Sequence, residues 1–491
     1  MRLTQLTAVL LAAGLALPAL AGPNDTALLE QLAARLEKLE TRNTELEQQV
    51  KALKGESDAI AQGLDSPRLS QYEPELTVRL KAVEKEALEM KKAAQIAEGL
   101  EGIKVGASLV TVGQKALGTP EGIEHGVSQL NYRADISVEL PLAPVGDIEH
   151  KLFAHLRMGQ GLGLNAAFSS LGHFASAPNA LAFRASGASP DDSVTILGQA
   201  WYQAAIPLPF LGFKPYSRET LALTFGKMDI FGFFDQNAAA GDESKQFLNS
   251  VFVHNPLLDA GGEVGVDANG FQPGFVASYL NYFDKTQPWR LSVGLFGAGD
   301  KGANYQRSLS SPLLMVQAEQ QLKLFEGLTG NYRVYGWNRS QGTDYDGSLS
   351  KHTGIGASID QRVGDGVRLF ARYGKLIKGE LPFNQAITAG AEISGSYWSR
   401  AGDAIGIAGA WLQSGKGYQT TTATAWLDDA QTLAAYRFTP RGAEKVAEIY
   451  YRYRLSPQFE LSPDFQLVTQ GGGNSNAKSV KVFALRANIA Y

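Results

Sequence analysis

Residues 231–246 combine aromatic rings with closely spaced polar and charged side chains. The rings come first, at Phe231, Phe233 and Phe234. The side chains that donate or accept hydrogen bonds follow: Asp235, Asn237, Asp242, Glu243 and Lys245. Sugar hydroxyl groups need donors and acceptors in quantity together with an aromatic face, so this segment is a candidate solute site. The alternative is a structural loop whose carboxylates cap turns or pair with arginines of a surrounding wall.

A second group of charged side chains occupies polar positions of segments that alternate polar and apolar residues. Its basic members are Arg133, Arg157, Arg372, Arg452 and Arg454. Its acidic members are Asp135, Glu139, Asp360 and Glu448. The arginines could form a ladder that attracts anions, or they could neutralise the acids, because a wall of low dielectric constant penalises unpaired charge. We favour pairing, which predicts weak ion selectivity.

The chain offers little for catalysis or metal binding. It has 6 His and 0 Cys, and the histidines lack metal-ligand spacing such as HExxH. His155 alone lies clearly on a polar strand face, and no serine partner for it is evident. The net charge of -4 gives no nucleic-acid footprint. We therefore expect no enzyme activity, no metal, no cofactor and no nucleic-acid partner.

Two segments with a period of two residues indicate what positions these side chains. The first is 130–140, where uncharged residues form one row and three charges fall on the other. The second ends the chain, where Phe483, Leu485, Ile489 and Tyr491 share one face and Arg486 the other. An apolar face opposite a polar one fits a strand between lipid and a water-filled lumen. A terminal strand of this kind can close a barrel, and we expect it to pair with the first strand near Ile103.

Similar alternation recurs over most of 100–491, with turn residues between the segments. Charged residues are 19% of the 491-residue chain, and no apolar run near twenty residues follows the extreme N-terminus. At about 24 residues per strand and connection, the region predicts an all-β antiparallel transmembrane barrel of about 16 strands, a size that leaves an aqueous channel.

The N-terminus reads as a secretory signal peptide, residues 1–21. Arg2 supplies a positive charge, the segment 8–20 an apolar core, and Ala19-Leu20-Ala21 a cleavage site of the small-x-small type. Export together with a membrane barrel places the protein in an outer membrane.

Residues 22–99 are predicted to form a periplasmic helical region with a coiled coil over 29–53. Its apolar heptad positions are Leu29, Leu32, Leu36, Leu39, Leu46, Val50 and Leu53. Asn43 occupies the remaining a position, where a polar residue fixes register and strand number. The heptads favour a homo-oligomer, although a helix packed on its own chain would show the same pattern.

The expected order of short turns and long loops orients the barrel, because such barrels keep short turns in the periplasm and long loops outside. Strands over 103–112, 148–158, 194–206 and 221–230, with a short turn at 141–146, make the segment from Phe231 onward the third outer loop. This is the position at which such channels commonly fold a loop inward.

Three motifs resemble the carbohydrate-selective porin family of Gram-negative outer membranes. They are Phe234-Asp235-Gln-Asn237 through Gln246-Phe247-Leu248-Asn249, Gly402-Asp403-Ala-Ile-Gly406, and Glu448-Ile-Tyr450-Tyr451-Arg followed by Leu461-Ser-Pro463-Asp464. The resemblance covers most of 100–491 and implies a sixteen-stranded diffusion channel that favours sugars or other small polar solutes. The alternative function is a barrel that anchors a periplasmic tether, with the helical region bound to peptidoglycan or another partner.

Overall fold

The computed structural model describes residues 41–42, 44–52, 54–55, 102–118, 127–165, 168, 175–183, 192–209, 217–258, 270–297, 311–420 and 440–491. The chain divides into two units, Met1–Glu101 and Gly102–Tyr491. In the first unit, the described residues between 41 and 55 are helical. The predicted signal peptide, Asn43 and most of the predicted heptads lie outside the described residues.

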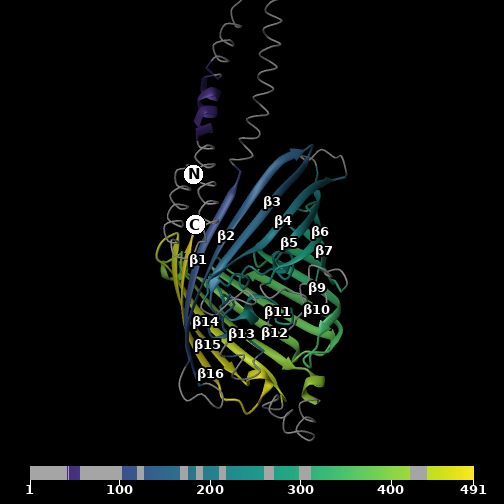
Figure 1. Ribbon diagram of the computed structural model, residues 1–491, viewed down its shortest axis with the longest axis vertical. Coiled ribbons are helices and arrows are strands. Elements are labelled where there is room, and N and C mark those ends of the chain that lie inside the picture. Colours follow the sequence, from purple (N-terminus) through teal and green to yellow (C-terminus); the bar gives the residue numbers. More distant parts are fainter. Residues whose placement is uncertain are drawn as a thin grey trace, which may run out of the picture. The chain divides into compact units, whose positions relative to one another are not determined.

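The second unit is a closed antiparallel barrel of sixteen strands, as predicted (Figure 1). Each strand pairs with its neighbours in sequence, and β16 pairs with β1. The first eight strands are β1 Lys104–Leu117, β2 Ser128–Val145, β3 Ile148–Gln160, β4 Val194–Leu208, β5 Glu219–Met228, β6 Gln272–Asn281, β7 Trp289–Phe296 and β8 Leu313–Leu324. The others are β9 Leu328–Thr343, β10 Leu349–Arg362, β11 Val367–Lys378, β12 Phe383–Ser394, β13 Ala404–Ser414, β14 Ala443–Arg454, β15 Phe459–Thr469 and β16 Val480–Ala490. Among the described residues, no helix is long and apolar enough to cross a membrane.

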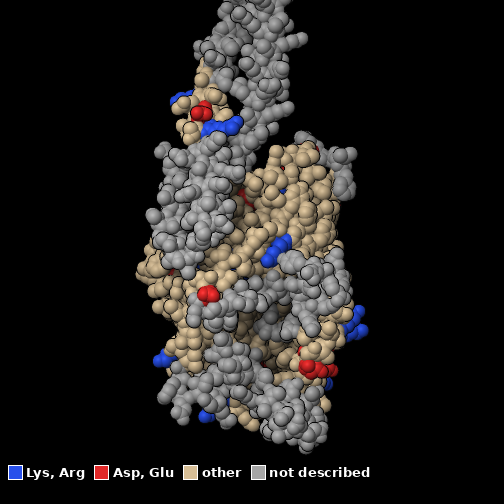
Figure 2. Space-filling model, in the orientation of Figure 1, with Lys and Arg blue, Asp and Glu red and all other residues tan. Residues whose placement is uncertain are grey.

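Alternating burial along the strands separates an outer face from a lumen face. On β16, Phe483 and Leu485 are 48% and 50% exposed, whereas Arg486 between the rows is 1% exposed. The same alternation on β2 leaves Leu130 exposed and buries Asn131 and Arg133. Uncharged side chains dominate the described wall in the view of Figure 2. This arrangement places apolar groups against lipid and polar groups inside.

The seam between the first and last strands lies further along β1 than the sequence indicated. Instead of closing near Ile103, β16 pairs from Ser108↔Ala490 to Leu117↔Lys481. The reason is that β1 is longer than predicted, and its first residues pair with β2 alone, beginning at Lys104↔Glu139.

The predicted turn at 141–146 is mostly strand. β2 continues to Val145, and the reversal occurs at Gly146, whose φ of +61° suits glycine. Pro141 pairs with Lys151 of β3, beyond the last β2 pair with β1 at Glu139. Proline is tolerated there because the other edge of β2 has no strand partner at that height.

The two ends of the barrel carry different connections. One end has the short turns, including 146–147, 325–327 and 455–458. The opposite end has the longest connections, including 161–193, 229–271 and 415–442. The described part of the β5–β6 connection, 229–258, is called loop 3 here. It contains the short helices η2 Ile230–Gly232 and α5 Ser250–Val253.

Deleting Tyr491 should reduce the yield of folded barrel more than the conductance of each channel that forms. The backbone N–H of Tyr491 donates to Ala107 O at 2.8 Å, and Ala107 N–H donates to Tyr491 O at 3.0 Å, so the deletion removes two bonds of the seam. Heat-modifiable gel mobility measures the yield, and single-channel recording measures the conductance. Equal yields for the deletion and the full chain would contradict the expectation.

Candidate functional site

Loop 3 folds into the barrel and packs on the lumen wall through aromatic side chains. Phe234, Phe247 and Phe252 are each 0% exposed. Phe234 contacts Phe296 of β7 edge-on, with ring centroids 5.9 Å apart. Phe247 contacts Tyr450 of β14 at 5.0 Å. The predicted inward fold of this loop thus follows from burial of its rings.

Asp235 is the most enclosed polar anchor of loop 3. Its Oδ1 accepts from the Tyr335 hydroxyl at 2.8 Å and from Arg372 Nε at 3.2 Å, and its Oδ2 accepts from Asn255 N at 2.6 Å. Arg372 also donates to the carbonyls of Asp235 and Phe252. Both charged side chains are 0% exposed. Asp235 and Arg372 therefore hold the loop on the wall and do not face the channel. This agrees with the alternative interpretation, in which the carboxylates of the loop pair with arginines of the wall.

Two further wall groups hold the other end of loop 3. Glu448 on β14 accepts from Leu248 N at 2.5 Å and Asn249 N at 2.9 Å. Arg486 on β16 donates through Nη1 to the carbonyls of Glu243 and Gln246. The expectation that Glu448 pairs with an arginine is wrong. Backbone N–H groups of the inserted loop satisfy it instead, which no strand pattern could reveal.

Three of the predicted loop residues differ in their surroundings. Asn237 donates to Ser358 Oγ and Ile359 O, and its own Oδ1 accepts from Ala239 N, so it joins the loop to β10. Asp242 accepts from Ser244 N and Ser244 Oγ within a turn. Lys245 is half-buried. Asn237 and Asp242 thus make the structural contacts expected of a packed loop.

Glu243 belongs to a charged network on the β2–β3 wall. It lies 2.8 Å from Arg133 Nη2, and Arg133 Nε lies 2.7 Å from Asp135. His155 and Arg157 each approach Asp135 Oδ1 at 2.7 Å. The structure therefore brings together Arg133, Asp135 and Arg157 as ion-paired neighbours, and it adds Glu243 from loop 3 and His155 from β3.

The charge of Glu243 is set by this network. Burial would raise its pKa, but the guanidinium groups of Arg133 and Arg157 outweigh burial and hold the pKa below the ordinary value of a glutamate. Glu243 is accordingly a carboxylate at neutral pH. Its side chain is 20% exposed, so solvent in the lumen reaches it.

Aromatic rings continue the same wall toward the short-turn end. Phe153 on β3 stacks on Trp201 on β4 with centroids 4.7 Å apart, and Trp201 meets Phe233 of loop 3 edge-on at 6.0 Å. Lys151 Nζ lies 5.7 Å from the Trp201 ring centroid and 2.6 Å from Glu139. Glu139 thus pairs with a lysine and not with an arginine.

The wall across the lumen has its own ion pairs. Arg333 bridges Glu319 at 3.2 Å and Asp360 at 2.8 Å. Arg290 also pairs with Glu319, and its Nη2 donates to Gln236 of loop 3 at 2.9 Å. Loop 3 therefore contacts charged residues on this wall as well.

The two remaining predicted arginines occupy β14. Arg452 Nη1 lies 3.4 Å from Glu392. Arg454 is exposed at the end of the strand, where it donates to the carbonyls of Ser456 and Pro457. Arg454 thus lies on the β14–β15 turn and not on the lumen wall, because β14 ends at that residue.

Sequence reasoning named Phe233 but missed the two wall aromatics, Phe153 and Trp201. Gly198 interrupts the register between β3 and β4, so the alternation along β4 does not indicate the face of Trp201. Trp201 stands two residues from Gln199, to which it donates at 3.2 Å. That spacing of an aromatic and a polar residue on one face was the available signal.

Comparison with known proteins agrees with this architecture. The sequence profile described as carbohydrate-selective porin, OprB family, matches residues 163–491. The structure is similar to that of Pseudomonas putida OprB at high pH, with a TM-score of 0.63 and 17% identity, over 80% of this chain and 96% of that one. It is also similar to the outer membrane channel DcaP of Acinetobacter baumannii, with a TM-score of 0.43 and 12% identity, over 80% and 98% of the chains. No curated protein sequence matches significantly. With a closed sixteen-stranded barrel, an inserted third loop and a matching profile over most of its length, the chain belongs to the carbohydrate-selective porin, OprB family, and is a porin of the outer membrane.

Proposed function

We propose that small neutral carbohydrates diffuse through this porin along the β2–β4 wall, between that wall and loop 3. The observation that carries the proposal is a contrast in exposure. Where loop 3 meets β11 and β14, the polar anchors are buried: the Arg372 side chain is 0% exposed, and Glu448 as a whole residue is 2% exposed. On the β2–β3 wall, the Asp135 and Arg157 side chains are each 17% exposed and Lys151 is 31% exposed. Solvent thus reaches the side chains of the β2–β3 wall.

The chemistry of that wall suits a polyhydroxylated solute. Phe153, Trp201 and Phe233 present partly exposed ring faces beside charged hydrogen-bonding groups. An apolar sugar face can pack on a ring while its hydroxyl groups bond to Glu243 and Arg157. Because these charges are paired with one another, a neutral solute meets no large net field.

Paired charges also support weak ion selectivity. Arg133, Arg157, Glu243 and Asp135 balance within one cluster, so neither cations nor anions gain strongly. The paired wall favours diffusion over chemistry: His155, the one strand histidine considered as a base, is held against Asp135. We propose a passive channel without catalytic activity.

The residues that precede the barrel have separate proposed roles. We propose that residues 1–21 direct export, that 22–99 form a helical region in the periplasm, and that the barrel begins near residue 100. Helix in the described residues between 41 and 55, with Val50 54% exposed, supports a coiled coil that joins copies of the chain through 29–53. Asn43 would then set the register. Peptidoglycan binding by this region is the corresponding proposal for a tether.

Replacing Trp201 by alanine should weaken sugar binding in the channel severalfold. The ring is the centre of the aromatic surface, and losing an aromatic contact of this kind costs about 0.5–1.5 kcal/mol beyond the buried area. Sugar-dependent block of single-channel conductance measures the half-saturating concentration. Liposome swelling with glucose, gluconate and glucosamine then compares a neutral sugar with an anion and a cation of similar size.

Trp289→Ala is the matched control, because Trp289 is 41% exposed on the outer face of β7. Its half-saturating concentration should equal that of the unaltered protein. If Trp201→Ala also leaves this concentration unchanged, the sugar does not pass over Trp201. Faster swelling with gluconate or glucosamine than with glucose would refute the preference for neutral solutes.

A further inference from the structure

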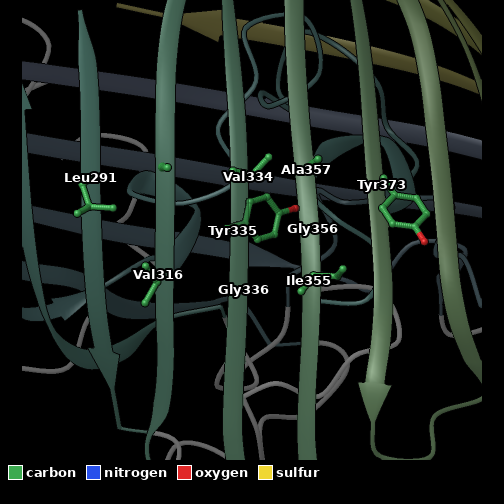
Figure 3. A pocket seen from close by; sticks show the side chains of 10 residues that line it. Leu291, Val316, Val334, Tyr335, Gly336, Ile355, Gly356, Ala357 and Tyr373 are labelled. Carbon is green, nitrogen blue, oxygen red and sulfur yellow. The ribbon is translucent and has the colours of Figure 1, made fainter.

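The outer wall of the barrel has a groove of about 570 Å³ across β7 to β11 (Figure 3). Small residues form part of its lining, namely Gly336, Ala318 and Ala357. Larger apolar side chains stand beside them: Val316, Val334 and Ile355 are 41%, 61% and 45% exposed. The groove therefore opens on the face that meets lipid, away from the lumen.

Three lysines lie beside this groove on the side of the long connections. Lys375 is opposite Ile355 in the β10–β11 register, and Lys378 is opposite Thr353. Lys351 lies two residues beyond Thr353 on β10, on the same face. Tyr373 lines the groove, and Lys375 lies two residues further along β11. At about 3.4 Å per strand residue, the two residues are about 7 Å apart along the strand. All three lysines are exposed.

Within the part of the chain that the structure describes, none of these three lysines forms an ion pair with an acidic side chain. Their neighbours on the outer face are uncharged: Asn338 Nδ2 donates to Thr353 Oγ1 at 2.7 Å, and Gln385 Nε2 to the Tyr373 hydroxyl at 3.5 Å. A lysine on the lipid face is costly at the bilayer midplane and nearly neutral near the interface. Unpaired positive charge at this height calls for an anionic partner from the membrane.

We propose that the groove and the lysine cluster Lys351, Lys375 and Lys378 bind a phosphorylated, acylated lipid of the outer leaflet. An acyl chain lies over Gly336, and a headgroup phosphate bonds to the lysines. The proposal uses the orientation of the barrel with its long connections outside, which places these lysines in the outer leaflet. The positive charge of the lysines favours a phosphate as the bound headgroup. The depression at Gly336 favours an acyl chain, because the chain can lie in it.

Glycine at position 336 is what leaves room for the chain. A Cβ there would meet only Gly354 O at 3.6 Å and Ile355 Cγ2 at 4.0 Å, which are ordinary contacts. A larger side chain at 336 would therefore fit the fold and occupy the groove. Gly336→Leu is thus a variant that removes the acyl site without disturbing the strands.

The test measures binding of bisphosphorylated lipid A to the purified full-length protein in detergent, by native mass spectrometry. Replacing the three lysines together by glutamine should weaken binding roughly tenfold to a hundredfold, since each lysine near a phosphate surface contributes measurably. Gly336→Leu should weaken it severalfold. Monophosphorylated lipid A should bind the unaltered protein less tightly than the bisphosphorylated form does. Replacing the lysines should also weaken its binding by a smaller factor.

Lys115→Gln, Lys445→Gln and Lys481→Gln together form the matched control. These lysines are exposed on β1, β14 and β16, and their loss removes the same charge from another part of the barrel. Binding should then change by less than twofold. Equal losses in both triple variants would overturn the site, and so would equal binding of a dephosphorylated lipid. Single-channel conductance should stay unchanged in every variant, which confirms folding and separates this proposal from that for sugar passage.

Discussion

Arg372→Met is expected to release loop 3 and to give larger, fluctuating single-channel conductance. Arg372 donates to Asp235 Oδ1, Asp235 O and Phe252 O, so its loss removes three bonds between β11 and the loop. It also leaves the Asp235 carboxylate, 0% exposed, without its cation. Breaking a buried pair on one side costs about 3–5 kcal/mol, enough to favour a displaced loop. Planar-bilayer recording measures the conductance.

The double variant Asp235→Asn with Arg372→Met should have a single-channel conductance closer to that of the unaltered protein than Arg372→Met has. Asparagine removes the buried charge, tolerates the φ of +55° at this position, and keeps an acceptor for the Tyr335 hydroxyl. Arg454→Met is the control, since the Arg454 side chain is exposed and donates to turn carbonyls, away from loop 3. A steady conductance of ordinary size in folded Arg372→Met protein would mean that other contacts hold the loop.

Arg133→Gln is expected to raise the pH at which protonation of Glu243 changes ion selectivity. The pKa of Glu243 is lowered, so its pairing with Arg133 is complete above the ordinary glutamate pKa of about 4.3 and is lost only as the pH falls through the lowered pKa. Protonation of Glu243 should therefore cause no change in the selectivity of the unaltered channel between about pH 7 and 5.

Without Arg133, burial has less opposition and the pKa of Glu243 rises. The variant should prefer cations at neutral pH, and this preference should decline on acidification at a higher pH than any change in the unaltered channel. Reversal potentials across a salt gradient measure the cation preference at neutral pH and its decline on acidification. Arg133→Lys keeps the positive charge, so its ion selectivity should depend on pH no more than that of the unaltered channel. A preference that does not change with pH in Arg133→Gln would show that Glu243 does not face the ion path.

Much of the fold was predictable because lipid and water impose a local pattern. Each membrane strand must alternate apolar and polar residues, so 130–140 and 483–491 could be identified as barrel strands by their side chains alone. Strand ends were harder to predict. Pro141 and Pro144 looked like a turn, yet they lie on a part of β2 that β1 does not reach.

The sequence by itself determined that the strands have an apolar and a polar face and that loop 3 holds rings and charges, because periodicity and composition are local. Only the tertiary structure decided what those residues do. Asp235 became a buried anchor because Arg372, far away in sequence, lies opposite it, while Glu243 stayed accessible because it meets Arg133 at the lumen wall. Closing the barrel also brought Trp201 of β4 against Phe233 of loop 3. Such contacts depend on how the loop crosses the lumen, and no strand repeat encodes that path.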